Sequence, residues 1–162
     1  METIKKRITW SKTVKTITIS TTVLLIIAEY MLLTAPTVNG SFAIYIPAII
    51  ALIILISGSQ APRSITLNDS KLVLQKLYGQ ITLPYNQIEE IKPFSFKHPI
   101  RVFGSGGFCG YIGLFHKRGF GFFTSFVGDE SQTFYIRMKN RKKYVFSCED
   151  YESIIERIAG KA

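Results

Sequence analysis

Residues 14–34 read VKTITISTTVLLIIAEYMLLT, and residues 42–56 read FAIYIPAIIALIILI. Only the uncharged stretch 35–41 separates these two apolar runs. The hydrocarbon core of a bilayer is about 30 Å thick and takes roughly 20 apolar residues per helix, a length that the first run matches. The second run, extended to residue 58, lies at the short end of the range of helix lengths that span a bilayer. We therefore expect a membrane α-hairpin with transmembrane helices at 14–34 and 42–58.

Basic residues flank this hairpin on both sides, and the chain as a whole carries a net charge of +9. The first 15 residues hold five cations against one acidic residue, and the segment from Arg63 onward is also net positive. Lys and Arg stay on the cytoplasmic side during insertion. Residues 1–13 are therefore predicted to be a basic cytoplasmic N-terminus and residues 35–41 a short extracytoplasmic loop. This explanation of the positive charge is preferred to nucleic-acid binding, and we expect no nucleic-acid partner.

Glu29 is the only carboxylate within either apolar run. Carboxylates inside a membrane are costly and often serve proton relays or subunit pairing, which makes Glu29 a candidate intramembrane polar site. Alternatively, Glu29 lies within about 8 Å of the outer end of its helix, where protonation or snorkelling relieves the cost. A cleaved signal peptide is not favoured, because no small-x-small site follows the first run.

Residues 63–162 read as one cytoplasmic domain behind a short linker. A stripe of apolar residues at i, i+3, i+4 and i+7 predicts a C-terminal amphipathic helix, with a start near Ser147 and Asp150 and a stop at Gly160. The alternation of apolar and polar residues predicts β-strands near 65–67, 72–77, 81–85, 133–138 and 143–147. A mainly-β domain whose last element is one helix is expected, since such a helix needs an apolar sheet face to cover.

Four segments carry a resemblance to a known family: SITL at 64–67, IEEI at 88–91, VFGSGGFCGY at 102–111 and KKYVFS at 142–147. Together with the two preceding apolar runs, they resemble the membrane-anchored bacterial pleckstrin-homology-like (PH-like) family. The resemblance implies that residues 63–162 form a PH-like bent β-sandwich or barrel with a C-terminal amphipathic helix. It also implies a place at the bacterial inner (cytoplasmic) membrane with both termini cytoplasmic, and it carries over no catalytic residue.

Residues 103–128 are rich in glycine and aromatic side chains. They match neither the P-loop nor the dinucleotide-binding fingerprint, so nucleotide binding is not predicted. Glycines here can serve tight turns and bent strands, with the aromatic rings in the core. Alternatively, some rings reach lipid headgroups or a partner protein. The candidates for such contacts are Phe120, Phe122, Phe123 and Phe126.

A second candidate contact site is the basic turn formed by Lys139, Arg141, Lys142 and Lys143. A charge run of this kind is often only a solvated turn. Near an anionic leaflet, however, each cation adds about 1 kcal/mol of attraction.

Neither histidines nor cysteines form a recognisable site. His98 and His116 are isolated, and Cys109 and Cys148 form no CxxC motif, so no metal, cofactor or catalytic residue is predicted. The leading hypothesis is a non-enzymatic membrane-anchored interaction module that docks a protein partner, a second copy of itself or anionic lipid at the inner membrane face. One alternative is a subunit or regulator of a transporter-type membrane complex that uses the hairpin and Glu29. Another is an enzyme acting on lipid or envelope precursors.

Overall fold

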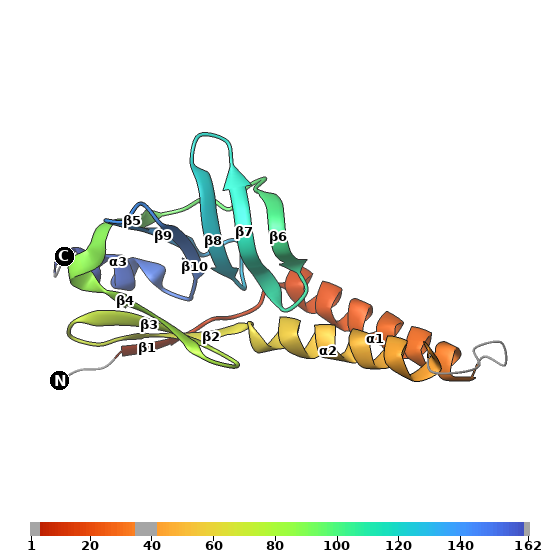
Figure 1. Ribbon diagram of the computed structural model, residues 1–162. Helices are drawn as coiled ribbons and strands as arrows, with labels where there is room; N and C mark the ends of the chain where they lie inside the picture. The colour runs from red at the N-terminus through yellow and green to blue at the C-terminus, as the bar shows by residue number, and fades with distance from the viewer. Residues whose placement is uncertain (1–3, 35–41, 161–162) are drawn as a thin grey trace.

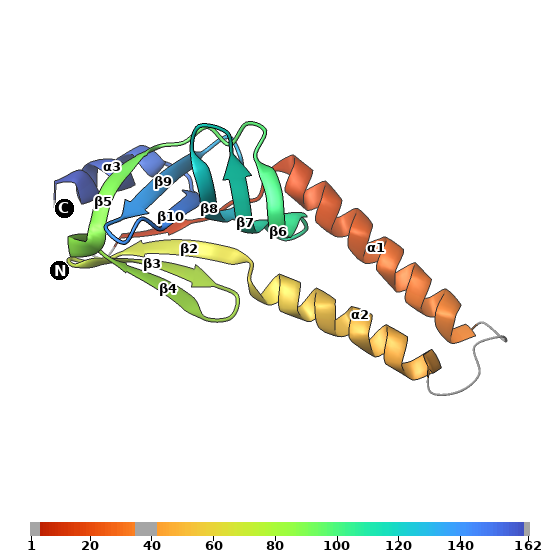
Figure 2. The same ribbon diagram turned by 45° about the horizontal axis from the view of Figure 1, so that its top comes forward.

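Two apolar helices leave the same end of a β-rich domain (Figures 1 and 2). They are α1 (Lys12–Thr34) and α2 (Phe42–Ser59). By length and composition α1 is able to cross a membrane, whereas α2 contributes a shorter apolar stretch over Tyr45–Ser59. The computed structural model describes residues 4–34 and 42–160, so the predicted loop at 35–41 lies outside the described residues.

The first sheet is antiparallel and continues directly from α2. It has the order β1-β2-β3-β4, and both views show β2 running away from the helices. Its members are β1 (Ile4–Arg7), β2 (Pro62–Leu67), β3 (Lys71–Lys76) and β4 (Gln80–Pro84).

Strand β1 is not expected from the sequence, which predicts only a basic tail before the first helix. It pairs with β2, with Ile4 opposite Leu67 and Arg7 opposite Ser64. The strand covers an edge of β2 that would otherwise expose unpaired N–H and C=O groups. Ile4 packs against the core, and Lys6 Nζ lies 2.6 Å from the carboxylate of Asp150.

The second sheet has the order β5-β9-β10-β8-β7-β6, with β10 parallel to β8 and the other pairs antiparallel. Across the described strands the two sheets remain separate. The expectation of a mainly-β domain that ends in one helix is confirmed, but the described strands form no closed barrel. The remaining elements before the last helix are the 3-10 helix η1 (Tyr85–Gln87), β5 (Ile88–Pro93), β6 (Ile100–Gly107), β7 (Gly110–Lys117), β8 (Gly121–Val127), β9 (Thr133–Met138) and β10 (Lys143–Ser147).

The main core lies between the first sheet, the β9–β10 region and α3 (Tyr151–Ala159), the predicted C-terminal helix. Ile154 and Ile158 of α3 are fully buried, as the apolar stripe predicts. The expected helix start at Ser147 is wrong, because the Ser147 hydroxyl is buried and accepts a hydrogen bond from Gly128 N at 2.8 Å. The residue before the helix is Asp150, in the left-handed region with φ of 54°. Lys6 donates to its carboxylate and holds the pKa of Asp150 below the ordinary value.

A second, mainly aromatic cluster packs with the segment between β5 and β6. Its buried members are Phe96, Phe115, Phe123, Val127 and Val145.

Candidate functional site

The turn between β9 and β10, residues 139–142, is called the distal tip here because it lies at the end of the domain away from the helices. Lys139 N donates to Gln87 O at 2.9 Å, and Tyr85 N donates to Ser70 O at the β2–β3 turn, also at 2.9 Å. These hydrogen bonds place the distal tip beside η1, and η1 beside the β2–β3 turn. The six-residue strand β2 separates that turn from α2, a length of roughly 20 Å. Charges are screened over about 8 Å at physiological salt, so a leaflet around α1 and α2 would attract the distal tip only weakly.

Three cations of the distal tip are free to meet another molecule. Lys139, Arg141 and Lys142 are exposed, and none forms an ion pair with any of the residues 4–34 and 42–160. Arg141 has φ of 65°, a region that glycine adopts without strain, so the turn retains a long cationic side chain at some cost.

Lys143 lies differently from the other three predicted cations. Its Nζ donates to the backbone oxygen of Phe120 and lies 4.5 Å from the centre of the Phe120 ring. Phe120 is half-buried against Phe123 and Tyr135, with ring centroids 5.6 and 5.0 Å apart. Lys143 and Phe120 therefore hold the β7–β8 turn in place rather than offering a free contact surface.

The remaining aromatic candidates on β8 differ in exposure. Phe122 is 62% exposed and lies beside His116, whereas Phe123 and Phe126 are only 2% and 7% exposed. The expectation of surface contacts is therefore wrong for Phe123 and Phe126. Phe123 points into the aromatic cluster, and Phe126 stacks on Phe146 in the main core.

Two glycines of residues 103–128 allow the close approach of β6 and β7. Gly104 and Gly113 lie opposite each other, with φ of 109° and 124°. A Cβ atom at either position would lie 2.1 or 2.3 Å from a backbone oxygen of the neighbouring strand. This pair supports the structural interpretation of the segment.

A groove of about 880 Å³ lies where the domain meets the start of α1 and the end of α2. We call it the base groove. Among the described residues that line it there is no Asp or Glu, and it was not predicted because it depends on β1. Its cationic lining residues are Lys5, Arg7, Lys15 and Arg63, and its large apolar ones are Ile8, Trp10 and Leu77.

The β6–β7 turn and the segment after β8 tie α1 to the domain. Cys109 N donates to Thr18 Oγ1 at 2.9 Å, and Ser11 N donates to Gly128 O at 3.0 Å. Val14, in the first turn of α1, has no exposed surface. Burial raises the pKa of the Cys109 thiol, and it raises the pKa of Cys148 to about 12, so both cysteines behave as small apolar residues.

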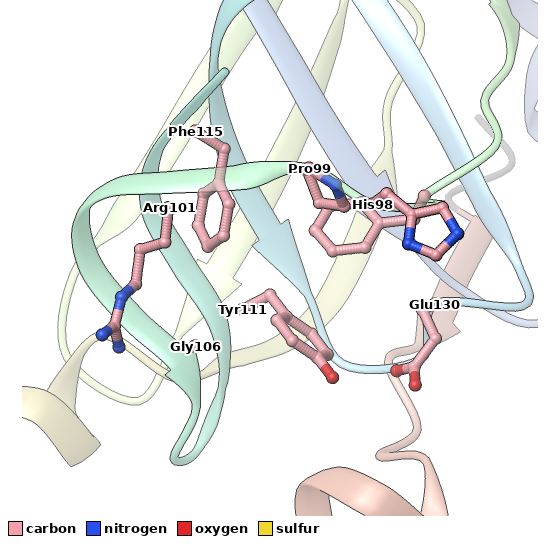
Figure 3. A pocket seen from close by; sticks show the side chains of 8 residues that line it. His98, Pro99, Arg101, Gly106, Tyr111, Phe115 and Glu130 are labelled. Atoms are coloured by element: carbon pink, nitrogen blue, oxygen red, sulfur yellow. The ribbon is translucent and has the colours of Figure 1, made fainter. Parts of the chain in front are cut away.

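A second cavity, of about 440 Å³, has polar side chains that do not converge (Figure 3). The Tyr111 hydroxyl points toward Glu130, whereas the Arg101 guanidinium points away from both. Glu130 accepts a hydrogen bond from Ser11 Oγ at 3.1 Å, and burial and Glu130 together raise the pKa of Tyr111. This arrangement positions the start of α1. Over the described part of the chain, no group of three or more His, Cys, Asp or Glu side chains could hold a metal.

Glu29 lies on α1, far along the helix from the domain. Its Oε1 atom is shielded from solvent and has no hydrogen-bond partner among the described residues.

Comparison with known proteins identifies the domain. The profile of the family described as bacterial PH domain matches residues 63–162. No curated protein matches the chain, and no solved structure matches it. The match spans both sheets from β2 onward and includes α3, and PH domains are generally non-catalytic interaction modules. This chain therefore belongs to the bacterial PH domain family.

Proposed function

We propose that this chain is a non-enzymatic interaction module that is anchored in the bacterial inner membrane and docks a protein partner on its cytoplasmic side. The observation that carries the proposal is the distal tip, a turn at the end of the domain away from the helices, where three exposed cations form no ion pair with any described residue. A partner with an acidic surface fits this turn by charge complementarity.

The pairing of β1 with β2 supports a hairpin that crosses the membrane twice. Strand β1 precedes α1 and β2 follows α2, yet the two strands are neighbours. Both helices must therefore have their domain ends on one side of the membrane. The basic residues around these ends favour the cytoplasmic side, and both termini are proposed to lie there.

Site-specific photo-crosslinking in native membranes tests partner docking. A photoreactive amino acid is placed at the exposed position Asn86, next to the distal tip. We expect a crosslink to one protein whose yield falls about fivefold or more in the triple variant Lys139→Gln, Arg141→Gln, Lys142→Gln, because three charge pairs are lost. The matched control removes three cations from the base groove by Lys5→Gln, Arg7→Gln and Arg63→Gln and should leave the yield unchanged. A crosslink insensitive to tip neutralisation, or the lack of any protein crosslink, contradicts the proposal.

A second candidate function is that of a subunit or regulator in a membrane complex assembled through the hairpin. Glu29 favours it, because its shielded carboxylate oxygen has no partner among the described residues and would gain one if another helix packed against it. The two candidates place the partner at opposite ends of the molecule.

Replacement of Glu29 separates this candidate from docking at the distal tip. If the hairpin assembles with partner helices, Glu29→Leu should reduce the amount of co-purifying membrane protein about tenfold, since an interhelical hydrogen bond and its packing are lost. Thr34→Val on the same helix is the control. Quantitative pull-down from native membrane measures the effect, and an unchanged complex rules out this candidate.

A further inference from the structure

We propose that the base groove binds the headgroup of an anionic phospholipid. The inference rests on the proposed membrane anchoring but not on docking at the distal tip, because it uses different residues at the opposite end of the domain. The shared chemistry of the ligand is a phosphate anion, and the position of the groove selects a lipid as its source.

The position of the groove places it at headgroup depth. Its wall includes Lys15 in the first turn of α1 and Gly58 in the last turn of α2, so it opens where both helices leave the domain. A lipid whose headgroup enters here can lay its chains along the apolar surface of the helices. Trp10 and Leu77 complete the wall, and tryptophan is enriched at this level of membrane proteins.

The charge of the groove is unbalanced in favour of an anion. Its four cations are exposed, and none of them forms an ion pair within the described part of the chain. A cleft lined by one sign of charge raises the local concentration of the opposite ion. Asp150 does not neutralise the groove, because its carboxylate is already engaged by Lys6 on the other face of β1.

The backbone holds these cations in a fixed arrangement. Along β1, Lys5 and Arg7 alternate with Ile4 and Lys6 and so point to the outer face of the sheet. Arg63 lies at an irregularity in the pairing of β2 with β3, between Pro62 and Ser64, where a bulge redirects the side chain. Its backbone oxygen accepts a hydrogen bond from Ile8 N at 3.0 Å, which fixes the two sides of the groove relative to each other.

Trp10 is the only tryptophan of the chain, so its fluorescence reports directly on the groove. The full chain in neutral detergent is titrated with dioctanoyl phosphatidylglycerol, dioctanoyl phosphatidylcholine or glycerol 3-phosphate. We expect a saturable change of Trp10 emission with phosphatidylglycerol that weakens as salt is raised. The triple variant Lys5→Gln, Arg7→Gln, Arg63→Gln should bind about tenfold or more weakly, because three attractions to the headgroup are removed.

The matched control neutralises Lys139, Arg141 and Lys142 at the distal tip, with the same loss of charge, and should bind phosphatidylglycerol as the unmodified chain does. Arg63→Lys, which keeps the charge, should restore most of the affinity lost in Arg63→Gln and shows that folding is not the cause. An equal response to phosphatidylcholine, an equal loss in the tip variant, or no saturable response would overturn the proposal. Binding of glycerol 3-phosphate as tight as that of the lipid would also overturn it, in favour of a soluble anion. None of these results alters the crosslink expected at Asn86.

Discussion

Gly113→Ala should unfold the β6–β7 pair, with a loss of about 4 kcal/mol in the free energy of unfolding. The added Cβ atom would lie 2.3 Å from Phe103 O and 2.9 Å from Gly104 Cα, and both are backbone atoms that cannot rotate aside. The φ of 124° adds strain that any L side chain meets. The two strands would have to separate three residue pairs from the turn that contacts α1, so the damage can reach the junction between domain and helix.

Gly119→Ala is the matched control, because Gly119 also has a positive φ, of 81°, but no atom lies within 4 Å of the position that its new Cβ atom would take. Conformational strain alone should cost about 1 kcal/mol there. Denaturant unfolding of the full chain in detergent, followed by circular dichroism, measures both variants. Equal losses would show that the close approach of the strands contributes nothing.

Phe123→Ala should lower the free energy of unfolding by about 4 kcal/mol, as expected for deletion of a buried ring. The Phe123 side chain is 2% exposed, and the centroid of its ring lies 5.4 Å from that of Phe94 and 6.0 Å from that of Phe115. The cavity left by its removal would lie in the middle of the aromatic cluster that supports the outer strands of the second sheet.

The neighbouring substitution Phe122→Ala is the control, and it should change stability by no more than about 0.5 kcal/mol because that ring is 62% exposed. The same unfolding measurement applies to both. A similar loss in the two variants would contradict the orientation of β8, since adjacent residues of a strand point to opposite faces.

Local periodicity was sufficient to predict the regular elements of the C-terminal half. The alternation at 133–138 places Phe134, Ile136 and Met138 on one face, and all three are buried in the main core. The helical stripe at Ile154 and Ile158 is likewise confirmed. Each of these patterns depends on neighbours along the chain, which the sequence displays directly.

Features that depend on distant pairings could not be predicted in this way. Strand β1 is only four residues long and mostly charged, so its role appears only when β2 lies beside it. The contact between Lys143 and Phe120 depends on the parallel pairing of β10 with β8, which joins segments far apart in the chain. The distance of the distal tip from the helices follows from the direction of β2, and no local pattern encodes that direction.

The position of β1 also has a consequence for how the protein is made. The ribosome delivers this strand first, then both helices, and only afterwards the strand with which it pairs. If the hairpin crosses the membrane as proposed, the sheet is completed only after both helices have been inserted and their domain ends lie in the same compartment. In a chain that inserts only one helix, β1 and β2 would lie on opposite sides of the bilayer, and the edge of β2 would remain unpaired. Such an edge is a template for aggregation, so in a membrane-anchored chain the assembly of the sheet would act as a check on the topology.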